Sequence, residues 1–323
     1  MSSPIKNTVP SHPRIVFMGT PDFAIPTLMA LILQGHHLLA VVTQPDRPKG
    51  RGKKMIPTPV KRLALEHNLP VLQPEKASDR QFCEQLREMN PDLIIVVAFG
   101  QILRKNVLDI PKWGAINIHS SLLPKYRGAA PIQWALFQDE EKTGLTIMRM
   151  DEGLDTGAIL FQKEVPILKD ETAGHLHDRL AQTAGDLIIT SLQEMHRGAF
   201  EEQPQDDTDA TYAPKIDKSM THIDWNQPAA KISALIRALD PVPGARTTLE
   251  GKEVKLFSSW VMLEGEQPGD PGMVLNNNEK ALFVKTAHGA VGIGEIQAPG
   301  KKRMPVADFL RGFPLAEKAI LGE

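Results

Sequence analysis

The stretch that decides the fold is Ala115-Ile-Asn-Ile-His-Ser-Ser-Leu-Leu-Pro-Lys-Tyr-Arg-Gly128. It begins with a short run containing β-branched side chains, which is typical of a strand, and the serines and proline that follow end that strand. Because side chains alternate along a strand, Asn117 and His119 project to the same side. The stretch therefore predicts an amide and an imidazole together at the C-terminal edge of a sheet, where open α/β folds place their ligands.

A carboxylate that suits this pair lies downstream in Gly153-Leu-Asp-Thr-Gly157, a sequence typical of a tight turn. Asparagine can donate to a developing oxyanion, histidine can relay a proton, and Asp155 can orient and charge-stabilise the histidine or a water molecule. Each residue alone also has a structural explanation, because buried polar networks and turns use the same residue types. Their combination at strand ends favours acyl transfer to an amine by Asn117, His119 and Asp155.

The surrounding sequence predicts an α/β fold with a mostly parallel sheet. A βαβ opening is expected from a strand at 14–18, a helix at 23–34 capped by Asp22 and closed by Gly35, and a strand at 38–43. Further strands are expected at 71–72, 93–98, 115–119, 145–150 and 158–165, with helices at 60–67, 80–89, 131–137 and 172–197. The first turn holds only Gly19, so the G-x-G-x-x-G fingerprint is absent, which argues against NAD or FAD.

The length of the chain and its changes in composition predict two domains. Residues 1–13, with three prolines, are expected to be a flexible tail, and residues 14–200 a catalytic domain. Residues 201–211 are acidic and poor in apolar side chains, which is typical of a linker. Residues 212–323 contain a helical pattern at 228–239 and short strands at 254–257, 273–275, 281–285 and 291–296, which favour a small barrel.

Composition and charge exclude several kinds of site. Cys83 is the only cysteine among 323 residues, so an internal disulfide and a multi-cysteine zinc site are excluded, and a reducing cytoplasm is favoured. No histidine lies near His119 at ligand spacing, so no metal is expected. The net charge of -2 demands no polyanionic partner, although a local patch can still bind one. Without a long apolar run or a signal-peptide core, the sequence predicts a cytoplasmic protein that does not contact a membrane.

Residues 44–59 form a long connection that concentrates positive charge around Asp46, its single acidic residue. Five cations lie there among glycines and prolines: Arg47, Lys49, Arg51, Lys53 and Lys54. Such a run is compatible with a solvated surface loop. It is also typical of a segment that contacts a phosphate backbone, which is the hypothesis we carry forward.

Several of these motifs together resemble a known superfamily. They are Asn117-Ile-His119, Ser121-Leu-Leu-Pro124, Arg127-Gly128, Pro131 and Gly153-Leu-Asp-Thr-Gly157, and they are similar to the formyltransferase and hydrolase superfamily that uses 10-formyltetrahydrofolate. This resemblance implies a Rossmann-like domain followed by an OB-like barrel, with catalysis by Asn117, His119 and Asp155 and no metal. The expected folate contacts follow two strand ends or precede the Asp155 turn: Phe99, Gly100, Gln101, Ser121, Leu122, Leu123, Pro124 and Asp151.

Further motifs are similar to the superfamily members that formylate methionine on charged initiator tRNA. They are Met18-Gly-Thr-Pro-Asp-Phe-Ala24, Thr43-Gln-Pro-Asp-Arg-Pro48, Gly50-Arg-Gly-Lys-Lys54, Tyr212-Ala-Pro-Lys215, Ile223-Asp-Trp225, Pro241-Val-Pro-Gly-Ala245 and Pro299-Gly-Lys-Lys-Arg-Met304. The resemblance implies initiator methionyl-tRNA and a small-molecule folate as partners, a carboxy-terminal domain that binds tRNA, and no obligatory protein partner. The alternatives are a formyltransferase for a ribonucleotide or an amino sugar, and an inactive RNA-binding protein with this fold.

Overall fold

The computed structural model describes residues 8–49, 54–263, 267–278, 281–316 and 319–322. The chain divides into two compact units, and each is described here by itself. Unit 1 comprises residues 1–128, 144–165 and 178–212. Unit 2 comprises residues 129–143, 166–177 and 213–323.

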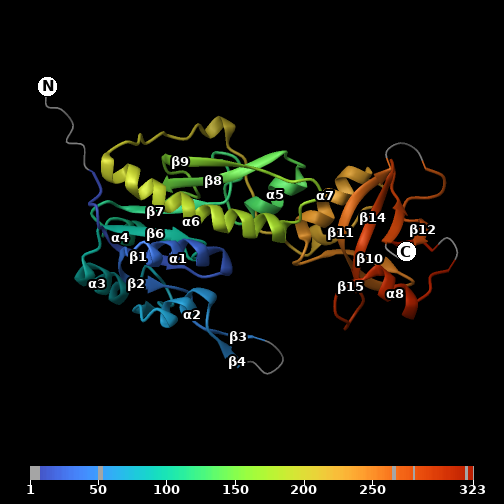
Figure 1. The fold of residues 1–323 in the computed structure, drawn as a ribbon, viewed down its shortest axis with the longest axis horizontal. Helices are drawn as coiled ribbons and strands as arrows, with labels where there is room; N and C mark the ends of the chain where they lie inside the picture. The colour runs from blue at the N-terminus through green and yellow to red at the C-terminus, as the bar shows by residue number, and fades with distance from the viewer. Residues whose placement is uncertain (1–7, 50–53, 264–266, 279–280, 317–318, 323) are drawn as a thin grey trace. The chain divides into compact units, whose positions relative to one another are not determined.

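Unit 1 is built on a seven-stranded sheet with the strand order β5-β2-β1-β6-β7-β8-β9 (Figure 1). The strands are β1 (Arg14–Gly19), β2 (His37–Val42), β5 (Val71–Leu72), β6 (Leu93–Val97), β7 (Ala115–His119), β8 (Lys142–Arg149) and β9 (Ile159–Pro166). The first five strands in the order pair in parallel, whereas β8 pairs with β7 antiparallel. Every residue of β6 is buried, as expected where both faces of a parallel sheet are covered. The predicted α/β class with a mostly parallel sheet is confirmed.

Helices cover the sheet of unit 1. They are α1 (Ile25–Leu33), α2 (Pro59–Glu66), α3 (Arg80–Met89), α4 (Lys105–Leu108) and most of α6 (Ala173–Arg197). Apolar side chains of α3 and α4, including Phe82, Leu86 and Val107, pack with those of β1 and β6 in one core cluster. Figure 1 shows α1 beside α6, and a Cβ on Gly185 of α6 would lie only 2.9 Å from the carbonyl oxygen of Pro26 in α1. In the described part of the chain, no helix is long and apolar enough to cross a membrane.

One local expectation for unit 1 was wrong, and two elements were not predicted. Asp22 does not cap the first helix, because it lies inside a short 3₁₀ turn (Asp22–Ala24) that precedes α1, although Gly35 ends that helix with a φ of +68° as predicted. The connection at 44–59 contains an antiparallel pair, β3 (Arg47–Lys49) and β4 (Lys54–Ile56). Helix α4 was not predicted, because four residues are too few for a periodic pattern.

Two segments that the sequence separates from the catalytic domain make contacts within unit 1. Residues 1–7 of the expected tail lie outside the described residues, but Val9 is buried and its carbonyl oxygen lies 3.0 Å from Nδ1 of His196. In the acidic segment 201–211, Gln203 pairs with Ile159 through backbone hydrogen bonds in both directions. Val9 and Gln203 therefore both contact residues of unit 1.

Unit 2 is built on an antiparallel sheet with the strand order β10-β11-β14-β13-β12, and β15 pairs with β14. The elements are α5 (Pro131–Phe137), α7 (Ala229–Leu239), β10 (Ala245–Leu249), β11 (Lys252–Leu263), β12 (Val274–Asn278), β13 (Ala281–Lys285), β14 (Ala290–Gln297), β15 (Met304–Pro305) and α8 (Val306–Gly312). The carboxy-terminal Ile320 and Leu321 bridge to Met273 and Leu249, so they join the two ends of the curled sheet. This antiparallel, barrel-like sheet confirms the predicted second fold.

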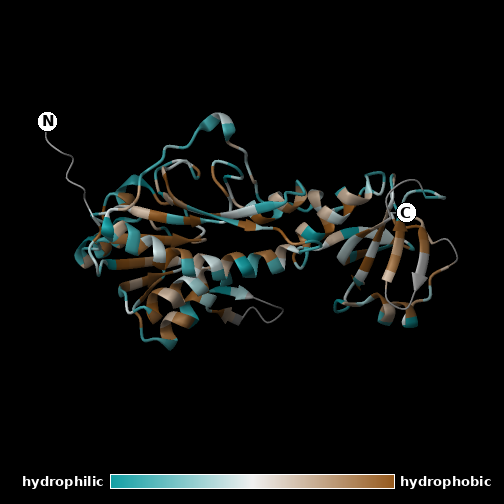
Figure 2. Cartoon of the chain, turned by 45° about the horizontal axis from the view of Figure 1, so that its top comes forward, coloured by the Kyte–Doolittle hydropathy of each residue, from teal (hydrophilic) through white to brown (hydrophobic). Residues whose placement is uncertain are grey.

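The core of unit 2 lies between α7 and the sheet. Ile232, Ile236 and Leu239, which recur at helical spacing, pack with Leu256 and Val291 of the strands in one cluster. In Figure 2 the central strands of the unit 1 sheet are mostly brown, while the long helix α6 mixes brown with teal. The alternation of burial along β10 was overlooked because it follows directly on a turn rich in proline and glycine, and the predicted 254–257 strand is in fact the twelve-residue β11.

Arg303 ties the turn after α7 to the sheet of unit 2. Its guanidinium pairs with Asp240 at 2.5 Å and with Glu295, and it lies 4.3 Å from the centre of the Phe257 ring. Burial opposes the charge of Arg303, but hydrogen bonds to Glu295 and Asp240 raise its pKa above the ordinary value. The Asp240 side chain is only 3% exposed, so it depends on this cation.

We expect Arg303→Ala to lower the free energy of unfolding by about 2 kcal/mol, because Asp240 would stay buried without its partner. This figure is below the usual range for a buried pair, since the Arg303 side chain is 30% exposed. Denaturant unfolding checks it, with Arg311→Ala as a control, because Arg311 is 78% exposed and pairs with Asp308 at the surface. Equal unfolding midpoints for the two variants would contradict the assignment.

Candidate active site

Strand β7 brings Asn117 and His119 to the carboxyl end of the parallel part of the sheet. Asn117 is aligned with Val96 of β6 on one side and Met148 of β8 on the other, so it lies inside the sheet. Its side chain is half-buried and makes no hydrogen bond with any residue that the structure describes. The amide is thus held on a strand with its donor still available to a ligand.

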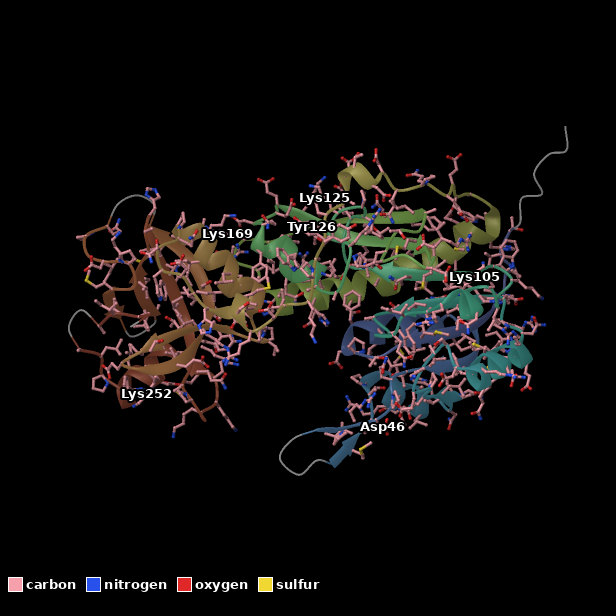
Figure 3. All side chains as sticks on the ribbon, turned by 180° about the vertical axis from the view of Figure 1, so that it is seen from behind. Asp46, Lys105, Lys125, Tyr126, Lys169 and Lys252 are labelled. Atoms are coloured by element: carbon pink, nitrogen blue, oxygen red, sulfur yellow. The ribbon has the colours of Figure 1, made fainter. Side chains whose placement is uncertain are left out.

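His119 is buried and lies between a backbone carbonyl and a carboxylate. Its Nε2 is 2.9 Å from the carbonyl oxygen of Tyr126, which Figure 3 labels in the loop that follows β7. Because a carbonyl oxygen can only accept, this contact assigns the proton to Nε2. Nδ1 faces Oδ2 of Asp155 at 3.6 Å, which is beyond hydrogen-bond distance and suits an ion pair when the ring is protonated. Nδ1 is therefore the nitrogen free to gain or lose a proton.

The turn that carries Asp155 is stabilised by its own side chains. Oδ1 of Asp151 accepts hydrogen bonds from the backbone N–H of Gly153 at 3.0 Å and from Oγ1 of Thr156 at 2.8 Å. Oδ2 of Asp155 accepts a hydrogen bond from the N–H of Gly128 at 2.8 Å. The predicted turn thus brings the carboxylate to His119, and it places Asp151 in contacts within the turn itself.

Among the expected folate contacts, residues 99–101 form the turn after β6. Phe99 is buried, and its carbonyl oxygen accepts a hydrogen bond from Oγ1 of Thr20 at 2.8 Å. Gly100 is exposed with a φ of +84°, a conformation that favours glycine. Oε1 of Gln101 accepts from the N–H of Ala77 at 2.7 Å. Of these three residues only Gly100 is exposed, and it presents backbone atoms because it has no side chain.

The second group of expected folate contacts, residues 121–124, forms a fixed loop. Ser121 is fully buried, and its hydroxyl donates to a carbonyl oxygen of the same loop at 2.6 Å. Leu123 is buried, and its N–H donates to Oγ1 of Thr146 at 3.1 Å. Leu122 and Pro124 are half-buried, and the Leu123–Pro124 peptide bond is cis. Ser121 and Leu123 shape the loop, whereas Leu122 and Pro124 keep part of their surface accessible.

Three of the five expected tRNA-binding cations lie in the strands of the β3–β4 hairpin, which we call the basic hairpin. Arg47 is exposed at the start of β3, and Lys49 pairs with Lys54 in the ladder of β3 and β4. The remaining two lie outside the described residues: Arg51 and Lys53.

The base of this hairpin is anchored by Asp46, which Figure 3 labels beside it. The carboxylate of Asp46 accepts hydrogen bonds from Nζ of Lys61 and from Nε2 of Gln73, both at 2.7 Å. These bonds, with that from Lys61 as the largest cause, hold the pKa of Asp46 below its ordinary value. Gln73 also donates to the carbonyl oxygen of Gln44 at 2.9 Å. The hairpin therefore emerges from a fixed base at the sheet edge.

Two residues near the site were missed by sequence reasoning. Arg127 is only 2% exposed although it carries a charge, and Gln205 contacts the backbone of the Asp155 turn. Arg127 lies in the same stretch as Asn117 and His119, so the sequence indicated that it could lie near the site. Nothing in the acidic segment set Gln205 apart from its neighbours as a site residue. Over the described ranges, no group of three or more His, Cys, Asp or Glu side chains is arranged to hold a metal ion.

Comparison with known proteins defines the class. A sequence profile described as formyl transferase matches residues 13–192, and one described as formyl transferase, C-terminal domain, matches residues 215–314. The chain therefore belongs to the formyl transferase family. It is 50% identical over 312 residues to the methionyl-tRNA formyltransferase of Pelobacter propionicus, with 97% of each chain covered. It is 48% identical over 310 residues to that of Geobacter sulfurreducens, with 96% of this chain and 97% of that one covered.

Solved structures with low sequence identity share the fold. HypX from Aquifex aeolicus in complex with tetrahydrofolic acid matches with a TM-score of 0.65 and 23% identity, over 95% of this chain and 48% of HypX. An N-formyltransferase from Helicobacter canadensis in complex with folinic acid and dTDP-3-aminofucose matches with a TM-score of 0.65 and 18% identity, over 88% of this chain and 99% of that one.

Proposed function

We propose that this chain transfers the formyl group of 10-formyltetrahydrofolate to the α-amino group of methionine on charged initiator tRNA. The product is N-formylmethionyl-tRNA, used in translation initiation, and we place the reaction in the cytoplasm without an obligatory protein partner. The observation that carries the proposal is the meeting of His119 and Asp155, 3.6 Å apart, at the end of the strand that holds Asn117. The full-length likeness to methionyl-tRNA formyltransferases supports the choice of acceptor.

The demanding step is the attack of the amine on the formyl carbon. Free α-amines have pKa values of about 7.7–8.0, so a neutral nucleophile is accessible near pH 7. The attack creates negative charge on the formyl oxygen, and one placed donor can stabilise such a charge by roughly 3 kcal/mol. We assign this role to the Asn117 amide, which has no competing hydrogen bond with a described residue. His119 adds a second donor when Nδ1 is protonated.

The amine must also lose a proton, and the leaving nitrogen of the folate must gain one. Nδ1 of His119 can exchange a proton because Nε2 is committed to the carbonyl of Tyr126. The Asp155 carboxylate stabilises the protonated ring or orients a water molecule between amine and leaving group. We assign proton transfer to the His119–Asp155 pair, without dividing the two transfers between them.

The residues around the pair fit a folate, which supplies the formyl carbon when bound. A folate is flat and partly apolar, with polar edges, and ligand sites of this kind combine apolar walls with a few placed polar groups. Leu154, next to Asp155, is 60% exposed, and Leu122 is half-buried. We assign the folate contacts to these apolar side chains and to the exposed backbone at Gly100, with Ser121, Leu123 and Asp151 shaping the loops.

We propose a division of labour along the chain. Residues 14–200 hold the formyl-transfer site, and residues 212–323 bind tRNA through their barrel-like sheet. The basic hairpin adds phosphate contacts to the acceptor end of the tRNA, because its cations are the main local concentration of positive charge in a chain whose net charge is -2. The acidic segment 201–211 stays packed on unit 1.

A competition assay tests the proposed function. The protein receives 10-formyltetrahydrofolate with methionyl initiator tRNA, a ribonucleotide amine and an amino sugar together. We expect the formyl group to be transferred to the tRNA far more rapidly than to either small amine. Preferential formylation of the ribonucleotide or the sugar would assign the chain to another formyltransferase, and no transfer at all would favour an inactive RNA-binding protein.

A crowded glycine gives a further prediction about the Asp155 turn. A Cβ on Gly157 would lie 1.8 Å from the carbonyl oxygen of Arg149, so the turn must move if alanine replaces this glycine. We expect Gly157→Ala to cost roughly 1–3 kcal/mol of unfolding free energy and to lower kcat by about tenfold or more. Gly312→Ala is the control, because nothing lies within 4 Å of a Cβ there. Wild-type kcat in Gly157→Ala would show that the turn tolerates displacement.

A further inference from the structure

Asp155 has a left-handed backbone conformation, which is unfavourable for most residues and must be stabilised by neighbouring groups. Its φ is +55°, in the left-handed region that few residues other than glycine adopt, although aspartate tolerates it better than most. Rotation of this backbone would carry the carboxylate away from His119. The groups that fix the Asp155 backbone therefore control the geometry of the proposed proton-transfer pair.

Gln205 supplies two of those groups. Its Nε2 donates to the carbonyl oxygen of Asp155 at 2.8 Å and to that of Gly157 at 2.7 Å. Its Oε1 accepts from Nε and Nη2 of Arg127, at 3.0 and 2.9 Å. Both hydrogens and both lone pairs of the amide are thus used, so the side chain has one satisfied orientation.

Arg127 is held at the other end of this contact. Its Nη2 pairs with Oδ1 of Asp207 at 2.8 Å, and its side chain is only 2% exposed. Burial of an arginine requires that its charge be paired and its donors used. Asp207 pairs with the charge, and Gln205 and Asp207 together accept the hydrogens of Nε and Nη2. Asp207 is 83% exposed, so the chain of contacts runs from the surface to the Asp155 turn.

The backbone on both sides of Arg127 contacts the two members of the pair. The preceding residue, Tyr126, presents the carbonyl oxygen that lies 2.9 Å from His119 Nε2. The following residue, Gly128, donates its N–H to Asp155 Oδ2 at 2.8 Å. The contact between Arg127 and Gln205 therefore joins the loop that holds His119 to the turn that holds Asp155.

We propose that Gln205 and Arg127 are positioning residues that hold the side chains of His119 and Asp155 in the relative position that proton transfer needs. This inference rests on the proposed function. They act through the backbone of residues 126–128 and 155–157, and no contact with substrate is needed. The decisive interaction is the pair of hydrogen bonds from Gln205 to the carbonyl oxygens of Asp155 and Gly157.

Two substitutions at Gln205 test this role. Gln205→Ala removes all four hydrogen bonds, whereas Gln205→Glu keeps the size and the acceptor for Arg127 but cannot donate to the carbonyl oxygens. We expect both variants to lower kcat by about 10- to 100-fold, the effect of a small misplacement of reacting groups, with little change in either KM. Gln203→Ala is the matched control, because Gln203 is exposed and its hydrogen bonds with described residues, both to Ile159, are made by its backbone. Thermal unfolding of each variant establishes that it is folded at the assay temperature.

Each outcome decides the proposal. An unchanged kcat in Gln205→Ala would overturn it, and so would wild-type kcat in Gln205→Glu, because the carbonyl contacts would then be dispensable. An equal reduction of kcat in Gln203→Ala would show a general effect of the segment and also overturn it. If Gln205→Ala does not stay folded, Gln205→Glu carries the test, since it retains the Arg127 contact. A wild-type protein without formyl transfer would contradict the proposed function instead, because the inference concerns the ratio of variant to wild type.

Discussion

Replacing Asn117 by alanine should lower kcat for formyl transfer by about 10²- to 10³-fold, the loss expected when one oxyanion donor is removed. The side chain makes no hydrogen bond to a described residue, so its removal leaves no buried partner unsatisfied. We therefore expect the free energy of unfolding to change by less than about 0.5 kcal/mol. Single-turnover rates at saturating folate and tRNA measure the chemical step separately from binding.

The same measurement applies to His119→Ala and Asp155→Asn, each of which should lower kcat by about 10²-fold or more. Asparagine is the better substitution at position 155, because it tolerates the left-handed backbone and keeps an oxygen for the Gly128 N–H. His175→Ala is the matched control, since His175 is exposed on α6. Near wild-type single-turnover rates in all three site variants would reject the assignment.

The second large effect concerns the basic hairpin. Its complete neutralisation should lower kcat/KM for charged tRNA by about 10³-fold, because each charge-assisted phosphate contact contributes roughly 1 kcal/mol or more. The residues replaced by alanine are Arg47, Lys49, Arg51, Lys53 and Lys54. With a net charge of -2, the chain as a whole does not attract a polyanion, so a local patch must supply that attraction. Folate affinity should stay the same.

A salt series separates phosphate binding from other effects of these substitutions. The log–log plot of kcat/KM against salt should become shallower by about 0.7 to 0.9 for each phosphate that the variant no longer neutralises. In the single variant Arg51→Ala, this slope should become shallower by the amount expected for one phosphate, and kcat/KM should decrease about tenfold. Arg80→Ala is its control, because Arg80 is 91% exposed on α3 and pairs with Glu84 in the same helix. Parallel salt slopes for wild type and Arg51→Ala would show an ordinary solvated arginine.

The elements that the sequence predicts well are those with strong local periodicity. Helix α3 (Arg80–Met89) and strand β7 (Ala115–His119) have the predicted bounds, because their apolar residues recur at the spacing of a helix and of a buried strand. The strand end that carries His119 and the tight turn that carries Asp155 were each recognisable from local sequence, whereas their contact at 3.6 Å comes from the fold. In contrast, the antiparallel pairing of β8 with β7 depends on how distant segments meet.

The parts of the site that could not be predicted depend on contacts between distant residues. Gln205 reaches the Asp155 turn across 50 positions in the sequence, from a segment whose acidic composition indicates only a linker. Arg127 is buried because two residues of that same segment accept its hydrogen bonds. Local propensity carries no information about such long-range pairs, so only the folded structure identifies them.

The most direct test of the proposed reaction follows one carbon atom. Donor folate labelled at the formyl carbon is incubated with the protein and methionyl initiator tRNA, and the products are separated after the ester bond to the tRNA is hydrolysed. We predict that the label is recovered in N-formylmethionine, and that the yield within one turnover falls steeply in Asn117→Ala. Recovery of the label as free formate, together with unformylated methionine, would make the protein a hydrolase and contradict this account.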